Sequence, residues 1–232
     1  MTVSANQNLI YKAVPELDRD TALKELDSGF AERAVEALLA LAFYDPDGRW
    51  VQNICRKYSG SSNEDVRRIA ILCFGHLARI HRTLETELVV PIVIEAMEDP
   101  SAYLSGTARD ALGDILMFCI PDNYQRTAAV ANLGSERIDR ILLGLFEIAK
   151  NDSDSQFAQE RCLEYSHHPN PVIRGVALNG FATIICQHRQ IDLEATMRLL
   201  AEAAGSDGYP GECARSAIDS IETHLLAIED VQ

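Results

Sequence analysis

Two stretches of the chain decide its fold: residues 63–82, NEDVRRIAILCFGHLARIHR, and residues 170–189, NPVIRGVALNGFATIICQHR. Both begin with Asn, place an Arg four residues later, continue with Ala and Phe at matching positions, and end in His-Arg. The two stretches lie 107 positions apart. This spacing indicates that one segment of the chain is a copy of the other.

The similarity extends well beyond these two stretches. Residues 26–82 and 133–189 are identical at 17 of 57 positions without a gap. After a slip of one residue, GTARDALGDI (106–115) aligns with ECARSAIDSI (212–221). Internal repetition is typical of architectures that stack similar units.

We therefore expect a tandem duplication. A lead segment, residues 1–18, precedes a first unit at residues 19–122 and a second unit at residues 123–232. The two units are expected to form one continuous array of helices.

The hydrophobic pattern is helical throughout both units. AERAVEALLALA (31–42) and VRRIAILCFGHLARI (66–80) place apolar residues at positions i, i+3, i+4 and i+7. The breaks between such segments are rich in Gly, Pro, Asp and Ser, and no segment shows sustained alternation with period two. The sequence predicts an all-α protein of about six helical hairpins, three in each unit, whose apolar faces are buried only by stacking on one another.

The hairpin pattern resembles the HEAT repeat. The segments that carry the resemblance are WVQNICRKYSGSSNEDVRRIAILCFGHLARI, FAQERCLEYSHHPNPVIRGVALNGFATII and, more weakly, VVPIVIEAMEDPSAYLSGTARDALGDIL. The resemblance covers nearly the whole chain after about residue 19 and implies a right-handed α-solenoid. In such proteins an Arg near the start of the second helix reaches an acidic loop residue of the neighbouring repeat. The resemblance thus implies a structural ladder between repeats, made by Arg67, Arg174, Asp45, Asp47, Asp152 and Asp154.

Composition restricts the classes of function. The formal net charge is −14, from 21 basic and 35 acidic residues, which disfavours a large nucleic-acid interface or binding to an anionic membrane surface. No apolar run is long enough to span a membrane, and the opening residues lack a signal-peptide pattern, so we expect a cytoplasmic protein. The six cysteines form no Cys-x-x-Cys pair and are expected to be small buried residues.

Searches for catalytic and metal-binding motifs give no candidate. The chain contains no His-Glu-x-x-His motif, Cys/His cluster, calcium loop, nucleophile elbow or phosphate-binding loop. We therefore expect no enzyme activity, no metal and no cofactor. Trp50, the only Trp, corresponds to Phe157 in the second unit, and this match favours a buried position for it.

Charge is distributed unevenly along the chain. Residues 49–82 have a net charge of +5, whereas residues 83–122 and 192–232 each have a net charge of −7. The concave face of a solenoid is its usual binding surface, and clustered carboxylates there would attract a basic protein. The predicted partner-binding residues are Glu95, Glu98, Asp99, Asp110, Asp114, Glu212, Asp219 and Glu222.

The segments YDPDGRWVQ and VRRIAILCFGHLARIH resemble small acidic bacterial HEAT-like proteins that act as immunity proteins against polymorphic or contact-dependent toxins. That resemblance implies a protein that is monomeric when free and neutralises a basic toxin domain. Two alternatives remain open: a subunit of a HEAT-like lyase that attaches bilin chromophores, and a HEAT-like DNA glycosylase, for which the basic stretch at residues 49–82 is the only support.

Overall fold

The computed structural model describes residues 13–188 and 191–229, so the first twelve residues of the predicted lead segment lie outside the described part of the chain. The described residues form twelve α-helices and no strand, which confirms the all-α prediction. The helices are α1 (Arg19–Leu26), α2 (Ala31–Tyr44), α3 (Gly48–Tyr58), α4 (Glu64–His81), α5 (Thr86–Met97), α6 (Ala102–Phe118), α7 (Arg126–Leu133), α8 (Ile138–Asn151), α9 (Ser155–Tyr165), α10 (Pro171–His188), α11 (Leu193–Ala204) and α12 (Tyr209–Glu229).

The helix boundaries repeat at the spacing found in the sequence. Each helix from α1 to α6 starts 107 residues before its counterpart among α7 to α12, as Arg19 and Arg126 show for the first pair. The last pair differs at its end, because α12 has 21 residues and α6 has 17. The duplicated sequence thus produces the same order of helices twice.

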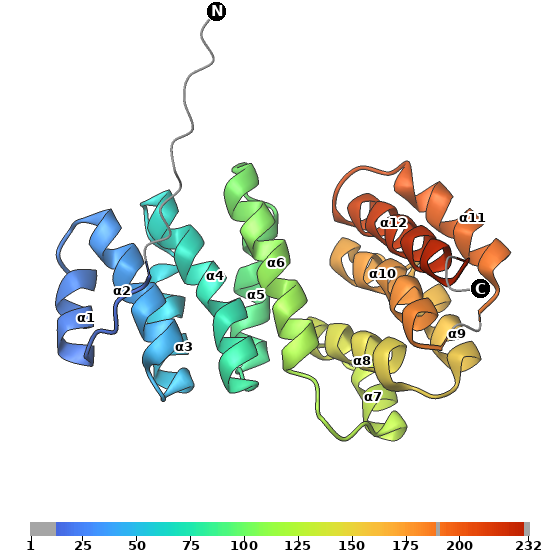
Figure 1. Cartoon of the computed structure of the whole chain (residues 1–232), viewed down its shortest axis with the longest axis horizontal. Helices are drawn as coiled ribbons and strands as arrows, with labels where there is room; N and C mark the ends of the chain where they lie inside the picture. Colours follow the sequence, from blue (N-terminus) through green and yellow to red (C-terminus); the bar gives the residue numbers. More distant parts are fainter. Residues whose placement is uncertain (1–12, 189–190, 230–232) are drawn as a thin grey trace, which may run out of the picture.

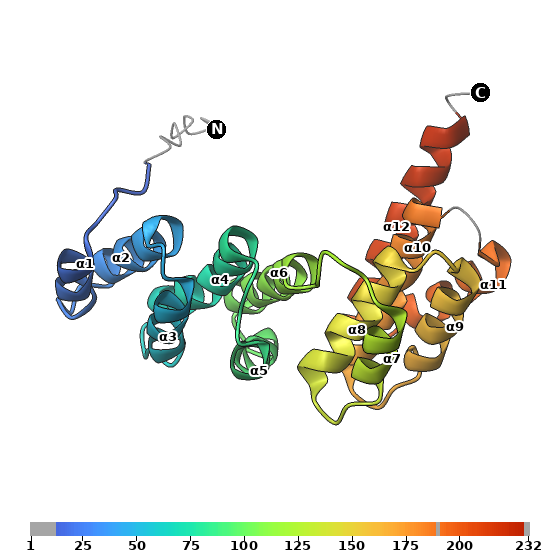
Figure 2. The same cartoon turned by 90° about the horizontal axis from the view of Figure 1, so that it is seen from below.

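Two kinds of packing organise these helices. Each odd-numbered helix packs against the even-numbered helix that follows it. The even-numbered helices also pack in two rows, α2–α4–α6 and α8–α10–α12 (Figure 1). The contact between the two rows differs from the contacts within a row, because α8 packs against both helices of the preceding pair, α5 and α6. Seen from below, α2, α4 and α6 are viewed nearly end-on while α8 and α12 run across the view, so the two units have different orientations (Figure 2).

Side chains in the turns begin several of these helices. The Asp47 carboxylate accepts a hydrogen bond from the backbone N–H of Trp50 at 3.0 Å, and Asp154 accepts the equivalent bond from Phe157 at 3.0 Å. Asn63 caps α4 in the same way through the N–H of Val66. These bonds satisfy N–H groups that have no acceptor within the first turn of a helix. The matching caps explain why the boundaries recur.

The core is built mainly from Ala, Leu, Ile and Val, as the low aromatic content requires. Its two largest fully buried side chains, Phe74 and Phe181, occupy equivalent positions of α4 and α10. Four of the six cysteines are buried as expected, whereas Cys119 is half-buried and Cys186 is exposed. Trp50 is half-buried, so the expectation of burial holds only in part.

Candidate functional site

The two arginines of the predicted ladder, Arg67 and Arg174, contact other groups than the aspartates expected from the sequence. Within the described residues, Arg67 and Arg174 each donate to a loop carbonyl just before their own helix, from Nη1 to Ser61 at 2.8 Å and to His168 at 3.0 Å. Side chains in the first turn of a helix point back toward its N-terminus, which explains this contact. Arg67 also lies 3.8 Å from Asp99 in the next helix pair. The predicted pairing of these arginines with Asp45, Asp47, Asp152 and Asp154 was therefore wrong.

Those four aspartates instead contact two arginines that sequence reasoning missed. Arg19 donates two hydrogen bonds of 2.6 Å to Asp45 and lies 3.8 Å from Asp47. Arg126 makes the equivalent contacts with Asp152 and Asp154. Arg19 and Arg126 are also 107 positions apart, a repeat that the sequence comparison could have found by starting a few residues earlier.

Each of these arginines also covers an aromatic ring. The guanidinium of Arg19 lies 4.3 Å from the ring centre of Trp50, and that of Arg126 lies 4.6 Å from Phe157. An Arg side chain that stacks on an aromatic ring and also donates two hydrogen bonds to one carboxylate is restricted to one geometry. The recurring Trp50/Phe157 position is therefore part of a structural contact.

The two aspartates are held in their charged form. Hydrogen bonds from Arg19 hold the pKa of Asp45 below its usual value. Burial pushes the pKa of Asp152 upward, but the hydrogen bonds that Arg126 and Tyr124 donate outweigh it, so that pKa is also lowered. The Asp152 side chain is 0% exposed. These ion pairs join each short first helix to the turn that follows its partner helix and so stabilise the packing of each pair.

The predicted acidic surface of α5 and α6 is partly used inside the molecule. Arginines from residues 49–82 reach across to carboxylates of residues 83–122, so the two oppositely charged blocks neutralise each other. The ion pairs are Arg49–Glu85, Arg67–Asp99, Arg79–Asp114 and Arg82–Asp122. Of the predicted partner-binding residues, Asp99 and Asp114 are therefore engaged within the chain.

The same pairing weakens the case for DNA binding. Six of the seven basic side chains in residues 49–82 lie within 4 Å of a carboxylate, once Lys57–Asp27 and Arg68–Asp65 are included. A phosphate would have to compete with these carboxylates for each cation. The exception is Arg56, for which the described residues provide no ion pair of this kind.

Arg56 lines a hollow between the α3–α4 and α5–α6 loops. The hollow has a volume of about 370 Å³ and is also lined by Arg67, Glu95 and Asp99. Its charged side chains balance, with two of each sign. The predicted residues Glu95, Glu98 and Asp110 are all exposed, and Glu95 lies at this hollow beside charges of both signs.

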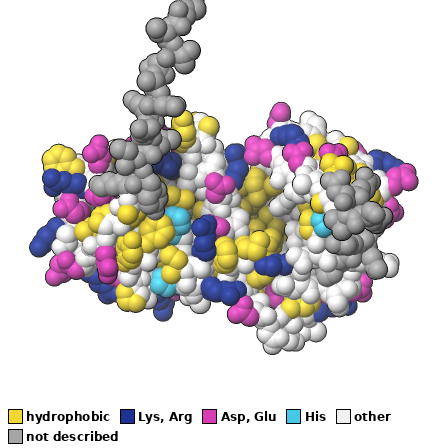
Figure 3. Space-filling model, viewed as in Figure 1, with side chains coloured by type: hydrophobic (Ala, Val, Ile, Leu, Met, Phe, Trp, Pro, Cys, Tyr) yellow, Lys and Arg dark blue, Asp and Glu magenta, His cyan; other side chains and the backbone are white. Residues whose placement is uncertain are grey.

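The negative charges of α11 and α12 are neutralised by ion pairs to a smaller extent than those of α5 and α6. Glu212 pairs with Arg109 of the first unit at 3.2 Å. Asp219 and Glu222 are exposed, and no ion pair involves them among the residues that the structure describes. Leu226, 62% exposed, lies four residues after Glu222 and so on the same face of α12. Figure 3 shows acidic side chains over this end of the molecule.

A separate apolar area lies over α2 and α4, at the other end of the molecule from α12 (Figure 3). Phe43 is 39% exposed, and its ring centre lies 4.7 Å from that of His76. Ile80, near the end of α4, is 46% exposed. In the second unit Thr183 occupies the position of His76. This surface is therefore not repeated, unlike the structural contacts above.

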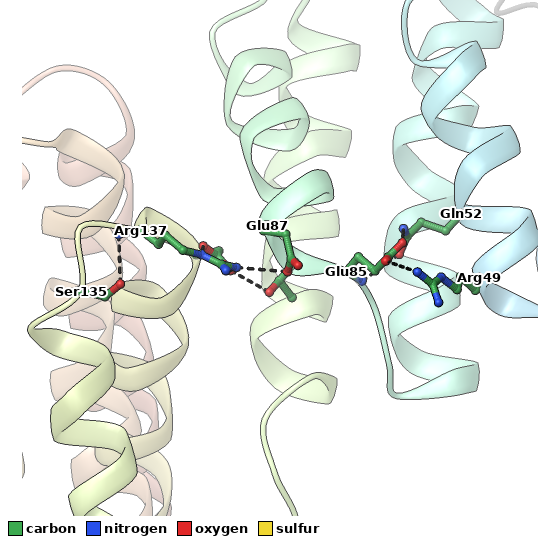
Figure 4. A network of polar contacts seen from close by, with 8 residues as sticks. Arg49, Gln52, Glu85, Glu87, Ser135 and Arg137 are labelled. Carbon is green, nitrogen blue, oxygen red and sulfur yellow. Dashed lines mark hydrogen bonds and ion pairs between the residues drawn. The ribbon is translucent and has the colours of Figure 1, made fainter.

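A polar network joins the two units at their junction (Figure 4). Within the first unit, Arg49 donates to the Glu85 carboxylate at 2.7 Å. The Gln52 side chain donates to the same carboxylate and accepts a hydrogen bond from the backbone N–H of Glu85. On the other side, Arg137 reaches Glu87 at 3.1 Å and Asp139 at 2.7 Å.

Asp139 is the buried centre of this junction. It is 3% exposed and accepts a further hydrogen bond of 2.8 Å from the Thr86 hydroxyl. Burial pushes its pKa upward, but bonds from Arg137 and Thr86 lower it overall. A buried carboxylate held by both units fixes how they meet.

No group of three or more His, Cys, Asp or Glu side chains suited to a metal ion occurs in the described ranges. Burial raises the pKa of the Cys162 thiol to about 12 and that of Cys213 to about 11, which removes these thiols as nucleophiles at neutral pH. None of the described helices is long and apolar enough to cross a membrane.

The chain matches no protein-family model, no curated protein and no solved structure.

Proposed function

We propose that this protein is a non-enzymatic scaffold that captures a basic protein partner, and that the partner is a toxin domain which it neutralises. The observation behind the proposal is the difference between the two acidic ends. Four of the eight carboxylates of residues 83–122 are paired with arginines of residues 49–82, whereas Asp219 and Glu222 of α12 remain exposed without an ion pair among the described residues. A basic partner would supply the missing charge.

The partner's binding surface combines this acidic face with the apolar area. Phe43 and Ile80, from α2 and α4, provide apolar contact, and α12, at the other end of the molecule (Figure 1), provides the charged contact. In the same proposal, the helix pairs form a right-handed α-solenoid of six HEAT-like hairpins, and the protein acts in the cytoplasm.

The test uses the purified full chain and a basic toxin domain encoded beside its gene. We expect a complex by isothermal titration calorimetry, weaker at high salt because screening removes the attraction between exposed charges. The double variant Asp219→Lys/Glu222→Lys should weaken it about tenfold or more, through a slower association rate. Absence of a complex would remove the toxin assignment.

Two matched variants test the surface itself. Glu136→Lys makes the same kind of charge change at an exposed position between α7 and α8, and should leave the affinity unchanged. Phe43→Glu should weaken the complex, whereas Leu163→Glu, at another exposed apolar position, on α9, should not. If the α12 variant bound as tightly as Glu136→Lys, the acidic face would not be the contact.

A further inference from the structure

The hollow between the α3–α4 and α5–α6 loops contains two charged side chains that no ion pair neutralises. The other two charged side chains in it form a pair, because Arg67 lies 3.8 Å from Asp99. Among the described residues, neither Arg56 nor Glu95 has an ion pair. One cation and one carboxylate therefore remain unneutralised in the lining of the same hollow.

Arg56 also has hydrogen-bond donors without acceptors. Its Nε is buried and has no hydrogen-bond partner among the described residues. Its Nη1 donates one long hydrogen bond of 3.3 Å to Asn53. A buried donor without a partner costs free energy, so an acceptor that enters the hollow would relieve that cost. A carboxylate is well suited to this role, because it can accept two parallel hydrogen bonds from one guanidinium group.

The second unit shows which charges of the hollow the repeat does not require. At the 107-residue shift, Leu163 stands in the place of Arg56, and Ser206 stands in the place of Asp99. The arginine contacts that hold the first helix pair of each unit together occur in both units. The full set of charges in the hollow is thus a feature of the first unit alone, and equivalent helices pack without it.

The remaining lining of the hollow is aliphatic. Its side chains are those of Ile71, Ile92, Ala96 and Leu104, of which Ile71 and Leu104 are each 1% exposed and belong to the core as well. The volume of about 370 Å³ is near the lower end of the range for sites that hold small organic molecules. A ligand that matches this hollow therefore carries one anionic group, one cationic group and a short aliphatic part.

We propose that this hollow binds a free α-amino acid with an aliphatic side chain. The α-carboxylate lies against Arg56 and the α-ammonium group against Glu95, while the aliphatic side chain packs on Ile92 and Leu104. A purely anionic ligand would leave Glu95 unmatched and would be repelled by it, and a purely cationic ligand would be repelled by Arg56 in the same way. This binding goes beyond the capture of a protein partner and does not depend on it.

An NMR titration of the free protein with L-leucine tests the assignment. We expect saturable shifts of the amide signals of Ser59 and Gly60, which line the hollow, with a Kd of about 1 mM or tighter. Leucinamide lacks the carboxylate and N-acetyl-leucine lacks the ammonium group, so each should bind more weakly by about tenfold or more. The absence of a saturable shift with leucine would overturn the proposal, and so would equal binding of either derivative.

Three variants locate the ligand. Arg56→Leu introduces the residue that the second unit has at this position, and Glu95→Gln preserves the shape of an exposed side chain. Both should keep the melting temperature of the parent and weaken leucine binding about tenfold or more. Glu202→Gln makes the same change at the equivalent exposed position of the second unit and should bind leucine like the parent.

These variants also separate this proposal from the proposed function. Leucine binding by Arg56→Leu or Glu95→Gln as tight as that of the parent would overturn the amino-acid site. Because the titration contains no protein partner, that result would leave the capture of a basic partner unaffected. Loss of partner capture would in turn leave leucine binding unchanged.

Discussion

At the scale of single residues, the main structural contacts occur once in each unit, at equivalent positions. Arg19 and Arg126 hold equivalent aspartates and cover equivalent rings. The two copies differ in burial, because the Asp45 side chain is 6% exposed and that of Asp152 is 0% exposed. A buried carboxylate depends more on its cation, since water cannot replace the lost partner.

Replacing Arg126 with Ala should therefore destabilise the protein more than replacing Arg19 with Ala. The lowered pKa of Asp152 means that the pair stabilises the fold above the unfolded-state pKa of about 3.9, and that this stability is lost as pH falls through the folded-state pKa. The loss in melting temperature caused by Arg126→Ala should be large at neutral pH and small in strong acid. Equal losses at both pH values would show that the ion pair is not responsible.

At the scale of helices, the capping side chains and the points where two helix backbones come close together decide how tightly the two helices of a pair pack. Helices α7 and α8 pack closely at Gly144, where an added Cβ would lie 2.8 Å from the backbone oxygen of Ala129. The counterpart in the first unit is Ala37, which is fully buried. The pair α1–α2 thus accommodates a methyl group that α7–α8 excludes.

Gly144→Ala should lower the free energy of unfolding by about 1–3 kcal/mol, because a backbone atom of α7 must move to admit the methyl group. Gly113→Ala, also within a helix, has no atom within 4 Å of the added Cβ and should raise that free energy by about 0.5–1 kcal/mol. Urea unfolding of both variants measures the difference. Two changes of the same sign would contradict the packing argument.

At the scale of the whole molecule, charge determines how units and helix pairs meet. The basic block at residues 49–82 and the acidic block at residues 83–122 are complementary surfaces of one stack. The junction adds a buried carboxylate, Asp139, that both units hold. The relative orientation of the units therefore depends on a few polar side chains.

Arg137→Glu should loosen this orientation, because it places a negative charge beside Glu87 and the buried Asp139. Small-angle X-ray scattering should show a larger radius of gyration, and thermal unfolding should separate into two transitions. Arg140→Glu makes the same change at an exposed position of α8 and should have neither effect. An unchanged scattering profile for Arg137→Glu would mean that the apolar contacts of α5, α6 and α8 alone fix the junction.

The amino-acid pattern by itself determined the helical class and the repeat length, because hydrophobic periodicity and turn composition are local properties. It also placed Phe74 and Phe181 at equivalent positions of the repeat, where both prove to be buried. Only the tertiary structure decided which charges meet. Arg67 was assigned to the wrong aspartates, and Asp114 was assigned to a partner although Arg79 neutralises it. Ion pairs between helices depend on distances across the stack, and a one-dimensional pattern does not contain those distances.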